Sequence, residues 1–311
     1  METPFIYSTP VTSKRYHTWD YHLKQKFGGK VFKVSLDGGF SCPNIDGTRG
    51  IGGCTYCSYA QRRVTPDHLL AQFAEVKAIL HKKWPVAQYI PYFQANTSTY
   101  APLEELKEKY ELMLAQPGVV GLAIATRADA LPPEVVEYLA QLNKRTYLIV
   151  ELGLQTIHDC TAEKINRGHS YEEFLIGYER LVSRGIPVCV HIINGLPGED
   201  KTMMVETMQE VARLPHLHSV KIHLLHVIAG TPLAQQYING EFAAMTMDDY
   251  VDVVCDQLEL LPAEVIIQRI TGDGLKDSLL APRWSLKKFI VMNAIDKELI
   301  RRGTYQGYKL K

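Results

Sequence analysis

The 311-residue sequence lacks an excess of charge of either sign, and it lacks a long apolar run. Lys+Arg and Asp+Glu number 34 each, so no global field draws the protein to nucleic acid or membrane, and any polyanion site must be local. No segment approaches the roughly 18 apolar residues that cross a bilayer, and residues 1–14 contain no signal-peptide core. We therefore expect a cytoplasmic protein without a membrane partner. A hydrophobic fraction of 46% excludes disordered and fibrous classes.

Short apolar runs alternate with segments whose apolar residues recur every three or four positions, which predicts a βαβα chain. Helix starts are indicated at Thr65, at Ser170 with Glu173, and at Thr246 with Asp249. We predict an α/β fold, a partial or full (β/α) barrel, with a doubly wound open sheet as the alternative. The expected strands are Val31–Leu36, Gln88–Ala95, Val119–Thr126, Tyr147–Gln155, Pro187–Asn194, Val220–Ile228 and Val265–Thr271.

Charge is uneven along the chain. Residues 1–33 hold six Lys/Arg and two acids, and residues 283–311 hold eight and two. We expect a basic N-terminal extension at 1–30, a barrel core at 31–275 and a C-terminal helical extension at 276–311. The basic ends predict either a solvated surface with salt bridges or a site for an anionic partner.

The spacing of the six cysteines matters more than their number, and three of them are grouped. Cys42, Cys54 and Cys57 form C-x11-C-x2-C directly after the first expected strand, where barrel active sites gather. Glycines within the loop allow it to fold back around a bulky group. Three thiolates without an obvious fourth ligand favour an iron-sulfur cluster over zinc. Zinc with His17 or His22, and a purely structural cluster, remain the alternatives.

Two further features complete a resemblance. Tyr56 precedes the last cysteine, and Gly195-Leu-Pro-Gly-Glu199 follows a later strand; together with the cysteine loop they resemble the radical S-adenosylmethionine (SAM) superfamily. The long first cysteine gap is similar to the branch of the Elongator catalytic subunit. Within that branch the chain resembles the bacterial YhcC/YtqA-type family, through residues 92–102, 151–155 with 166–169, and 269–273 with 284–288.

The resemblance implies a radical SAM barrel whose three cysteines, Cys42, Cys54 and Cys57, hold a 4Fe-4S cluster, with SAM on the fourth iron. An electron from the cluster would cleave SAM to a 5'-deoxyadenosyl radical, which takes hydrogen from the substrate. A low-potential electron donor, a flavodoxin or ferredoxin, is then expected as a partner.

The resemblance also implies polar contacts to SAM. Glu151 and Gln155 share one strand face with Gly153 between them, or else form a glycine-relieved bulge. Arg167 is expected to pair with the SAM carboxylate, its alternative being a surface cation. Three residues end the second strand, where the superfamily usually has Gly-Gly-Glu. The full expected set is Gln94, Asn96, Thr97, Glu151, Gln155, Arg167 and Asn194.

A third group of residues is expected to meet the substrate. The charged residues of this group lie at strand ends or in the basic C-terminal part of the chain. The histidines of the group lie on inner strands, and a hydrogen-bonded structural role is their alternative. The set is Arg127, His191, His223, Arg269, Asp273, Lys287 and Lys288. The leading hypothesis is modification of a tRNA wobble uridine, with phosphates contacted by the basic ends. The alternatives are radical chemistry on a small molecule or protein side chain, and a non-enzymatic iron-sulfur electron carrier.

Overall fold

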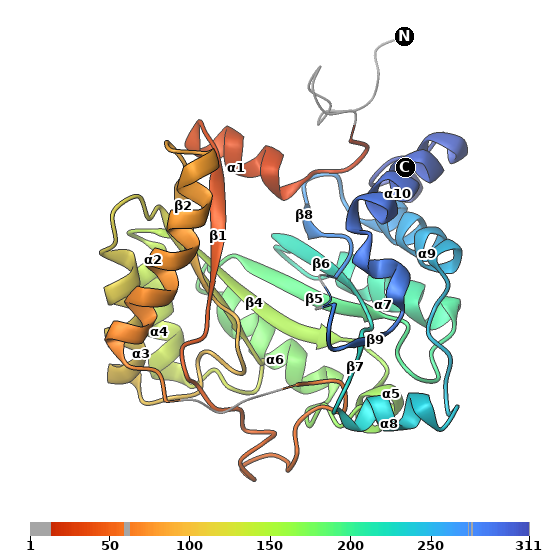
Figure 1. Cartoon of the computed structure of the whole chain (residues 1–311), viewed down its shortest axis with the longest axis horizontal. Coiled ribbons are helices and arrows are strands. Elements are labelled where there is room, and N and C mark those ends of the chain that lie inside the picture. Colours follow the sequence, from red (N-terminus) through yellow and green to blue (C-terminus); the bar gives the residue numbers. More distant parts are fainter. Residues whose placement is uncertain (1–13, 59–62, 273, 275, 311) are drawn as a thin grey trace.

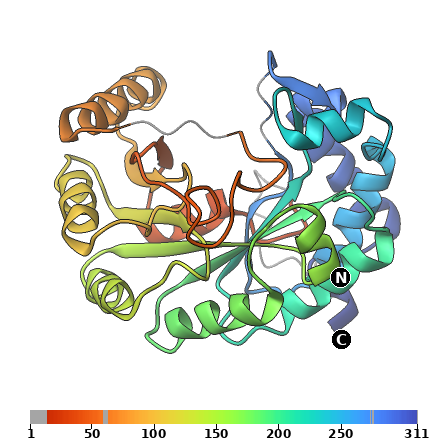
Figure 2. The same ribbon diagram turned by 90° about the horizontal axis from the view of Figure 1, so that it is seen from below.

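The computed structural model describes residues 14–58, 63–272, 274 and 276–310. A seven-stranded parallel sheet forms its centre, in the order β1-β2-β3-β4-β5-β6-β8. The sheet curls, with the helices on its outer face and the loop after β1 on its concave side (Figure 2). Within the described residues β1 and β8 are its two edges, unpaired with each other. The fold is therefore an incomplete (β/α) barrel, as predicted, and the open doubly wound alternative is wrong.

The strands fall close to the predicted positions. They are β1 Val31–Leu36, β2 Gln88–Phe93, β3 Gly121–Thr126, β4 Tyr147–Gln155, β5 Val188–Asn194, β6 Ser219–Leu224, β7 Val227–Ile228, β8 Ile266–Arg269 and β9 Leu279–Ala281. The expected sixth strand is split, because β7 leaves the barrel and pairs antiparallel with β9. The second strand ends two residues early, and Asn96 beyond it has a left-handed φ of 56°.

Helices cover the outer face of the sheet and lie at both ends of the barrel (Figure 1). They are α1 Trp19–Phe27, α2 Pro66–Lys83, α3 Leu103–Leu114, α4 Pro133–Asn143, α5 Asp159–Lys164, α6 Tyr171–Val182, α7 Lys201–Ala212, α8 Pro232–Ile238, α9 Met247–Leu260 and α10 Lys288–Arg302, with short 3-10 turns at Arg283–Leu286 and Tyr308–Leu310. The three predicted starts are confirmed: Thr65 and Thr246 accept N-cap hydrogen bonds, and Ser170 forms a capping box with Glu173.

The described residues nearest each terminus pack onto the barrel. Tyr16 is 2% exposed, and Thr18 bridges Ile267 of β8, so α1 lies across the end of the barrel opposite the cysteine loop (Figure 1). At the other terminus Arg302 of α10 makes hydrogen bonds to Asp256 and Glu259 of α9. The predicted divisions at residues 30 and 275 stay predictions. No helix among the described residues is long and apolar enough to cross a membrane.

Candidate functional site

The three grouped cysteines lie in the loop between β1 and α2, at the carboxyl ends of the barrel strands. Cys42, Cys54 and Cys57 are free thiols that line one cavity of about 600 Å³. Cys57 is exposed and the other two are half-buried. The cavity extends from this loop into the curl of the sheet, so a group held by the thiols faces the interior of the barrel.

Asn44 organises the cysteine loop. Its side chain is fully buried, and its Nδ2 donates to the backbone carbonyl of Asn166 and lies 3.7 Å from the Sγ of Cys54. The backbone N–H of Thr55 donates to the carbonyl of Ile165 at 2.9 Å. These bonds fasten the loop to the turn after α5. Sequence reasoning missed Asn44, although an Asn two residues after the first cysteine of a glycine-rich loop was its available signal.

The thiols have the chemistry of metal ligands. A hydrogen bond from the Cys57 thiol lowers the pKa of Cys54 to about 6, against the effect of burial and helped by the charge of Arg127. A thiolate therefore forms readily at Cys54.

Most of the expected SAM contacts line the same cavity. Gln94, Asn96, Thr97, Glu151 and Gln155 all reach its wall. The Thr97 hydroxyl is buried without a hydrogen-bond partner in the described structure, which leaves it available to a ligand. Asn96 holds the loop, because its Nδ2 donates to the carbonyl of Phe40 at 2.9 Å. The pairing of β4 with β5 shifts between Gly153 and Gln155, so the predicted alternative of a bulge is present here.

One expected SAM contact, Asn194, does not line the cavity. Asn194 is 1% exposed and exchanges hydrogen bonds with Gln257 of α9 at 2.8 Å, on the helix-facing side of β5. His191 faces the cavity, and a residue three positions further along a strand points to the opposite face. The prediction for Asn194 was therefore wrong.

Arg167 supports the backbone around the bulge. It is 1% exposed, and its guanidinium donates to the carbonyls of Leu154, Thr156 and His169 and lies 3.2 Å from Asp159. Arg167 also lines the cavity, so its contact with the SAM carboxylate stays a prediction. The alternative of a surface cation is wrong, because the side chain is buried.

The expected substrate residues separate into three places. Arg127 and Arg269 line the cavity, Arg127 forming a bidentate ion pair with Asp129 at 2.8 and 2.9 Å. Lys287 and Lys288 lie at the start of α10 and do not contribute to the described cavity walls. His191 and His223 also line the cavity, and Asp273 falls outside the described residues.

A polar network occupies the inner end of the cavity, and sequence reasoning missed that Lys33 and Lys221 belong to it. The Glu151 carboxylate is fully buried and accepts hydrogen bonds from Lys33, Lys221 and the Nε2 of His191, the last at 2.8 Å. These charges hold the pKa of Glu151 well below its usual value although burial opposes them. The available signal was a lysine within each of two otherwise apolar strands.

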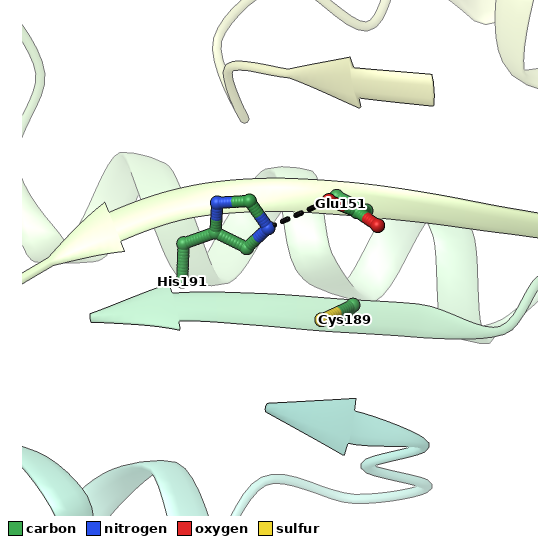
Figure 3. A group of neighbouring side chains, drawn as sticks. All are labelled: Glu151, Cys189 and His191. Carbon is green, nitrogen blue, oxygen red and sulfur yellow. Dashed lines mark hydrogen bonds and ion pairs between the residues drawn. The ribbon is translucent and has the colours of Figure 1, made fainter. Parts of the chain in front are cut away.

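Glu151, Cys189 and His191 form a potential metal-ligand group (Figure 3). Their ligand atoms lie within 4.8 Å of one another. The Lys33 and Lys221 ammonium groups already neutralise the carboxylate, and burial raises the pKa of Cys189 to about 12. A cation would have to compete with two fixed positive charges, so this group is an ion-pair network and not a metal centre.

His191 and His223 face each other across neighbouring strands, with ring centroids 5.0 Å apart. Burial lowers the pKa of His191 to about 4, so its ring is neutral near pH 7. The Nε2 of His223 is buried and has no hydrogen-bond partner in the described structure. His191 is hydrogen-bonded within the protein and lines the cavity, so its substrate contact stays a prediction, whereas His223 presents an unsatisfied polar atom to the cavity.

Many cations of the basic ends are paired within the protein. Lys24 and Lys30 contact Asp20, Lys14 contacts Asp296, and Lys33 lies inside the barrel. The aromatic residues near them also pack inward: Tyr16 is buried, and Trp284 donates to the carbonyl of Met245. The electrostatic attraction for RNA expected from these ends is therefore weaker than their composition indicates.

Comparison with known families agrees with this fold and cysteine loop. Residues 47–211 match the Radical SAM superfamily model, and residues 217–301 match the Radical_SAM C-terminal domain. The chain belongs to the radical SAM superfamily, whose enzymes use a 4Fe-4S cluster and SAM. The cavity suits these groups, with three thiols at one end and an unpartnered Thr97 hydroxyl beside them.

Among individual proteins, the chain is 54% identical to the YtqA protein of Bacillus subtilis over 98% of its own length and 95% of that protein. It is 35% identical to YhcC of Escherichia coli, over 93% of each. A solved structure of Methanocaldococcus infernus Elp3 has the same fold, with a TM-score of 0.66 at 19% identity, covering 89% of this chain and 64% of that one.

A shorter match joins the chain to a tRNA uridine(34) acetyltransferase of Methanocaldococcus jannaschii. The two are 29% identical over 173 residues, which cover 55% of this chain and 31% of that protein.

Proposed function

We propose that this radical SAM enzyme modifies a wobble uridine of tRNA. The observation that carries the proposal is the 173-residue match to a tRNA uridine(34) acetyltransferase, which spans more than half of this chain. Lys287 supports it as an exposed cation next to Lys288, at the start of α10. The chain covers only 31% of that relative, so the acetyl transfer named for the relative is not part of the proposal.

In this proposal Cys42, Cys54 and Cys57 hold the cluster, which when bound supplies the electron that cleaves SAM. Asn44 keeps the loop in place, and Gln94, Thr97 and Gln155 contact SAM from the cavity wall. Arg127 stands beside the cysteines as a fixed positive charge, held by Asp129. The walls of the cavity exclude water from the reacting groups.

A low-potential flavodoxin or ferredoxin would deliver the electron at the cysteine loop. Cys57 is exposed, and Ile51 in the same loop is 82% exposed. An apolar residue beside an accessible ligand gives a redox partner a short approach to the cluster.

The test is mass spectrometry of tRNA nucleosides from cells with and without the protein. We expect one modified wobble uridine to decrease in its absence, its precursor to accumulate, and wild-type protein but not Cys54→Ala to restore it. Unchanged tRNA nucleosides would contradict the proposal.

A second candidate keeps the radical chemistry and gives it a small-molecule substrate. The pairing of Lys14, Lys24 and Lys30 with acids of the same chain favours it, because those cations are not free to bind phosphates. Under this candidate the same cells would show a changed metabolite with unchanged tRNA nucleosides.

A further inference from the structure

The inner end of the cavity carries a buried positive charge in excess. Lys33 and Lys221 share one carboxylate, that of Glu151, and His191 donates to the same group as a neutral ring. Two ammonium groups and one carboxylate leave one positive charge over among these side chains, and the Arg269 guanidinium lines the same cavity. Lys221 is only 4% exposed, so water compensates little of that charge.

A second observation points to a ligand at the same place. His223 lines the cavity, is buried, and its Nε2 has no hydrogen-bond partner in the described structure. Buried polar nitrogen atoms in folded proteins are almost always paired, so a group absent from the protein itself is expected here. Tyr92 lies at the same level, with its hydroxyl 3.0 Å from the Nζ of Lys221.

There is room for such a group beyond the cysteines. A neighbouring cavity of about 300 Å³ is lined by Lys33 and shares Tyr92 and Lys221 with the main one. Together they extend from the cysteine loop towards α1, at the opposite end of the barrel. SAM bound beside the three cysteines would leave this inner end to another molecule.

We propose that the inner end, formed by Lys221, His223 and Tyr92, binds the carboxylate of a small-molecule substrate. Burying a carboxylate, which carries a single negative charge, costs less desolvation than burying a phosphate monoester, which carries nearly two. Lys221 supplies the counter-charge and His223 a polar contact, while Glu151 fixes Lys221 in position. This proposal rests on the proposed function in one respect, because both place the reaction in the same cavity. In the modification of tRNA, the small molecule is then a second substrate beside the tRNA.

Ligand-dependent thermal unfolding of the reconstituted, SAM-bound protein tests this site, with acetate as the probe. Acetamide is the uncharged probe of the same shape, inorganic phosphate is the dianionic probe, and chloride keeps the ionic strength constant. Because a ligand that binds only the folded state raises Tm, acetate should produce a saturable rise and acetamide none. Acetate should also saturate at a lower concentration than phosphate.

Variants locate the effect. Lys221→Met should raise the half-saturating acetate concentration at least tenfold, and Lys297→Met, on the exposed face of α10, should leave it unchanged. If Lys221→Met does not fold, His223→Phe decides, since it removes a contact without leaving a buried carboxylate short of a partner. It should raise the half-saturating concentration several-fold.

Equal Tm shifts with acetate and acetamide would overturn the proposal, as would tighter saturation by phosphate or an unchanged acetate response in the decisive variant. A positive acetate result with unchanged tRNA nucleosides would remove the tRNA proposal alone. A changed tRNA nucleoside together with no acetate-specific rise in Tm would remove the carboxylate site alone.

Discussion

The side-chain amide of Asn44 lies 3.7 Å from the Sγ of Cys54 and donates at the same time to the backbone carbonyl of Asn166. One buried side chain thus connects the cysteine loop with the turn that follows α5. A weak donor to a thiolate sulfur stabilises the negative charge that a metal cluster requires. Asn44 is therefore a positioning residue of the site.

Asn44→Ala should reduce the iron bound after anaerobic reconstitution several-fold without abolishing it. Loss of the buried hydrogen bond should also lower the free energy of unfolding by about 1–3 kcal/mol. Iron content and denaturant unfolding measure the two effects. Full iron occupancy with unchanged stability would show that Asn44 does not hold the loop.

Gly168→Ala should destabilise the protein through the same residue. Gly168 has φ +77°, and a Cβ there would overlap the amide of Asn44. Gly185 is the matched control, with φ +69° and no atom within 4 Å of an added Cβ. Both alanines bear backbone strain of about 1–2 kcal/mol, and Gly168→Ala should lose about 1–3 kcal/mol more. Equal losses in urea unfolding would contradict the packing described for Asn44.

Arg167→Gln should weaken folding and not only SAM binding. Its guanidinium donates to the carbonyls of Leu154, Thr156 and His169, and each would lose this donor, although the Leu154 carbonyl keeps the backbone N–H of Thr156. We expect a loss of about 2–4 kcal/mol in unfolding free energy, since at least one buried acceptor cannot find another donor. A variant with wild-type Tm and a raised SAM dissociation constant would leave only the contact with the SAM carboxylate that the sequence indicated.

Stability should fall below pH 6.5 because of a buried histidine near α1. Burial, with a contribution from the charge of His22, lowers the pKa of His218 from 6.5 to about 3. Between these values the unfolded chain binds a proton that the folded chain does not, so acid favours unfolding by up to about 1.4 kcal/mol per pH unit for this group. His218→Gln should flatten the decline between pH 6.5 and 5 in denaturant unfolding. The exposed His68→Gln is the control, and identical slopes for both variants would disprove the assignment.

The strands of the barrel were predictable because buried parallel strands are apolar on both faces and stand out between amphipathic helices. The split of the sixth strand was not, since Val227 and Ile228 continue the apolar run and leave the sheet only because β9 pairs with them. This pairing depends on β9, which is distant in the sequence, so the local sequence pattern does not predict it.

The cysteine loop was likewise readable, because the spacing of its thiols carries the chemistry. The direction of individual polar side chains was less accessible. His191 and Asn194 were both assigned to the cavity although strand alternation places them on opposite faces. Lys33 was counted with the basic N-terminal end, but it lies inside the barrel against Glu151. Such pairings depend on which strands become neighbours, and that order follows from the fold as a whole.

The account depends on a cluster that three cysteines hold and that leaves one iron for SAM. The most direct measurement is electron paramagnetic resonance of the reconstituted, reduced protein with and without SAM, followed by an assay for 5'-deoxyadenosine. We predict that SAM changes the cluster spectrum and is cleaved, that Cys54→Ala loses both signals, and that Cys160→Ala, which alters an exposed cysteine outside the loop, retains them. A spectrum indifferent to SAM, or zinc bound in place of iron, would contradict the account.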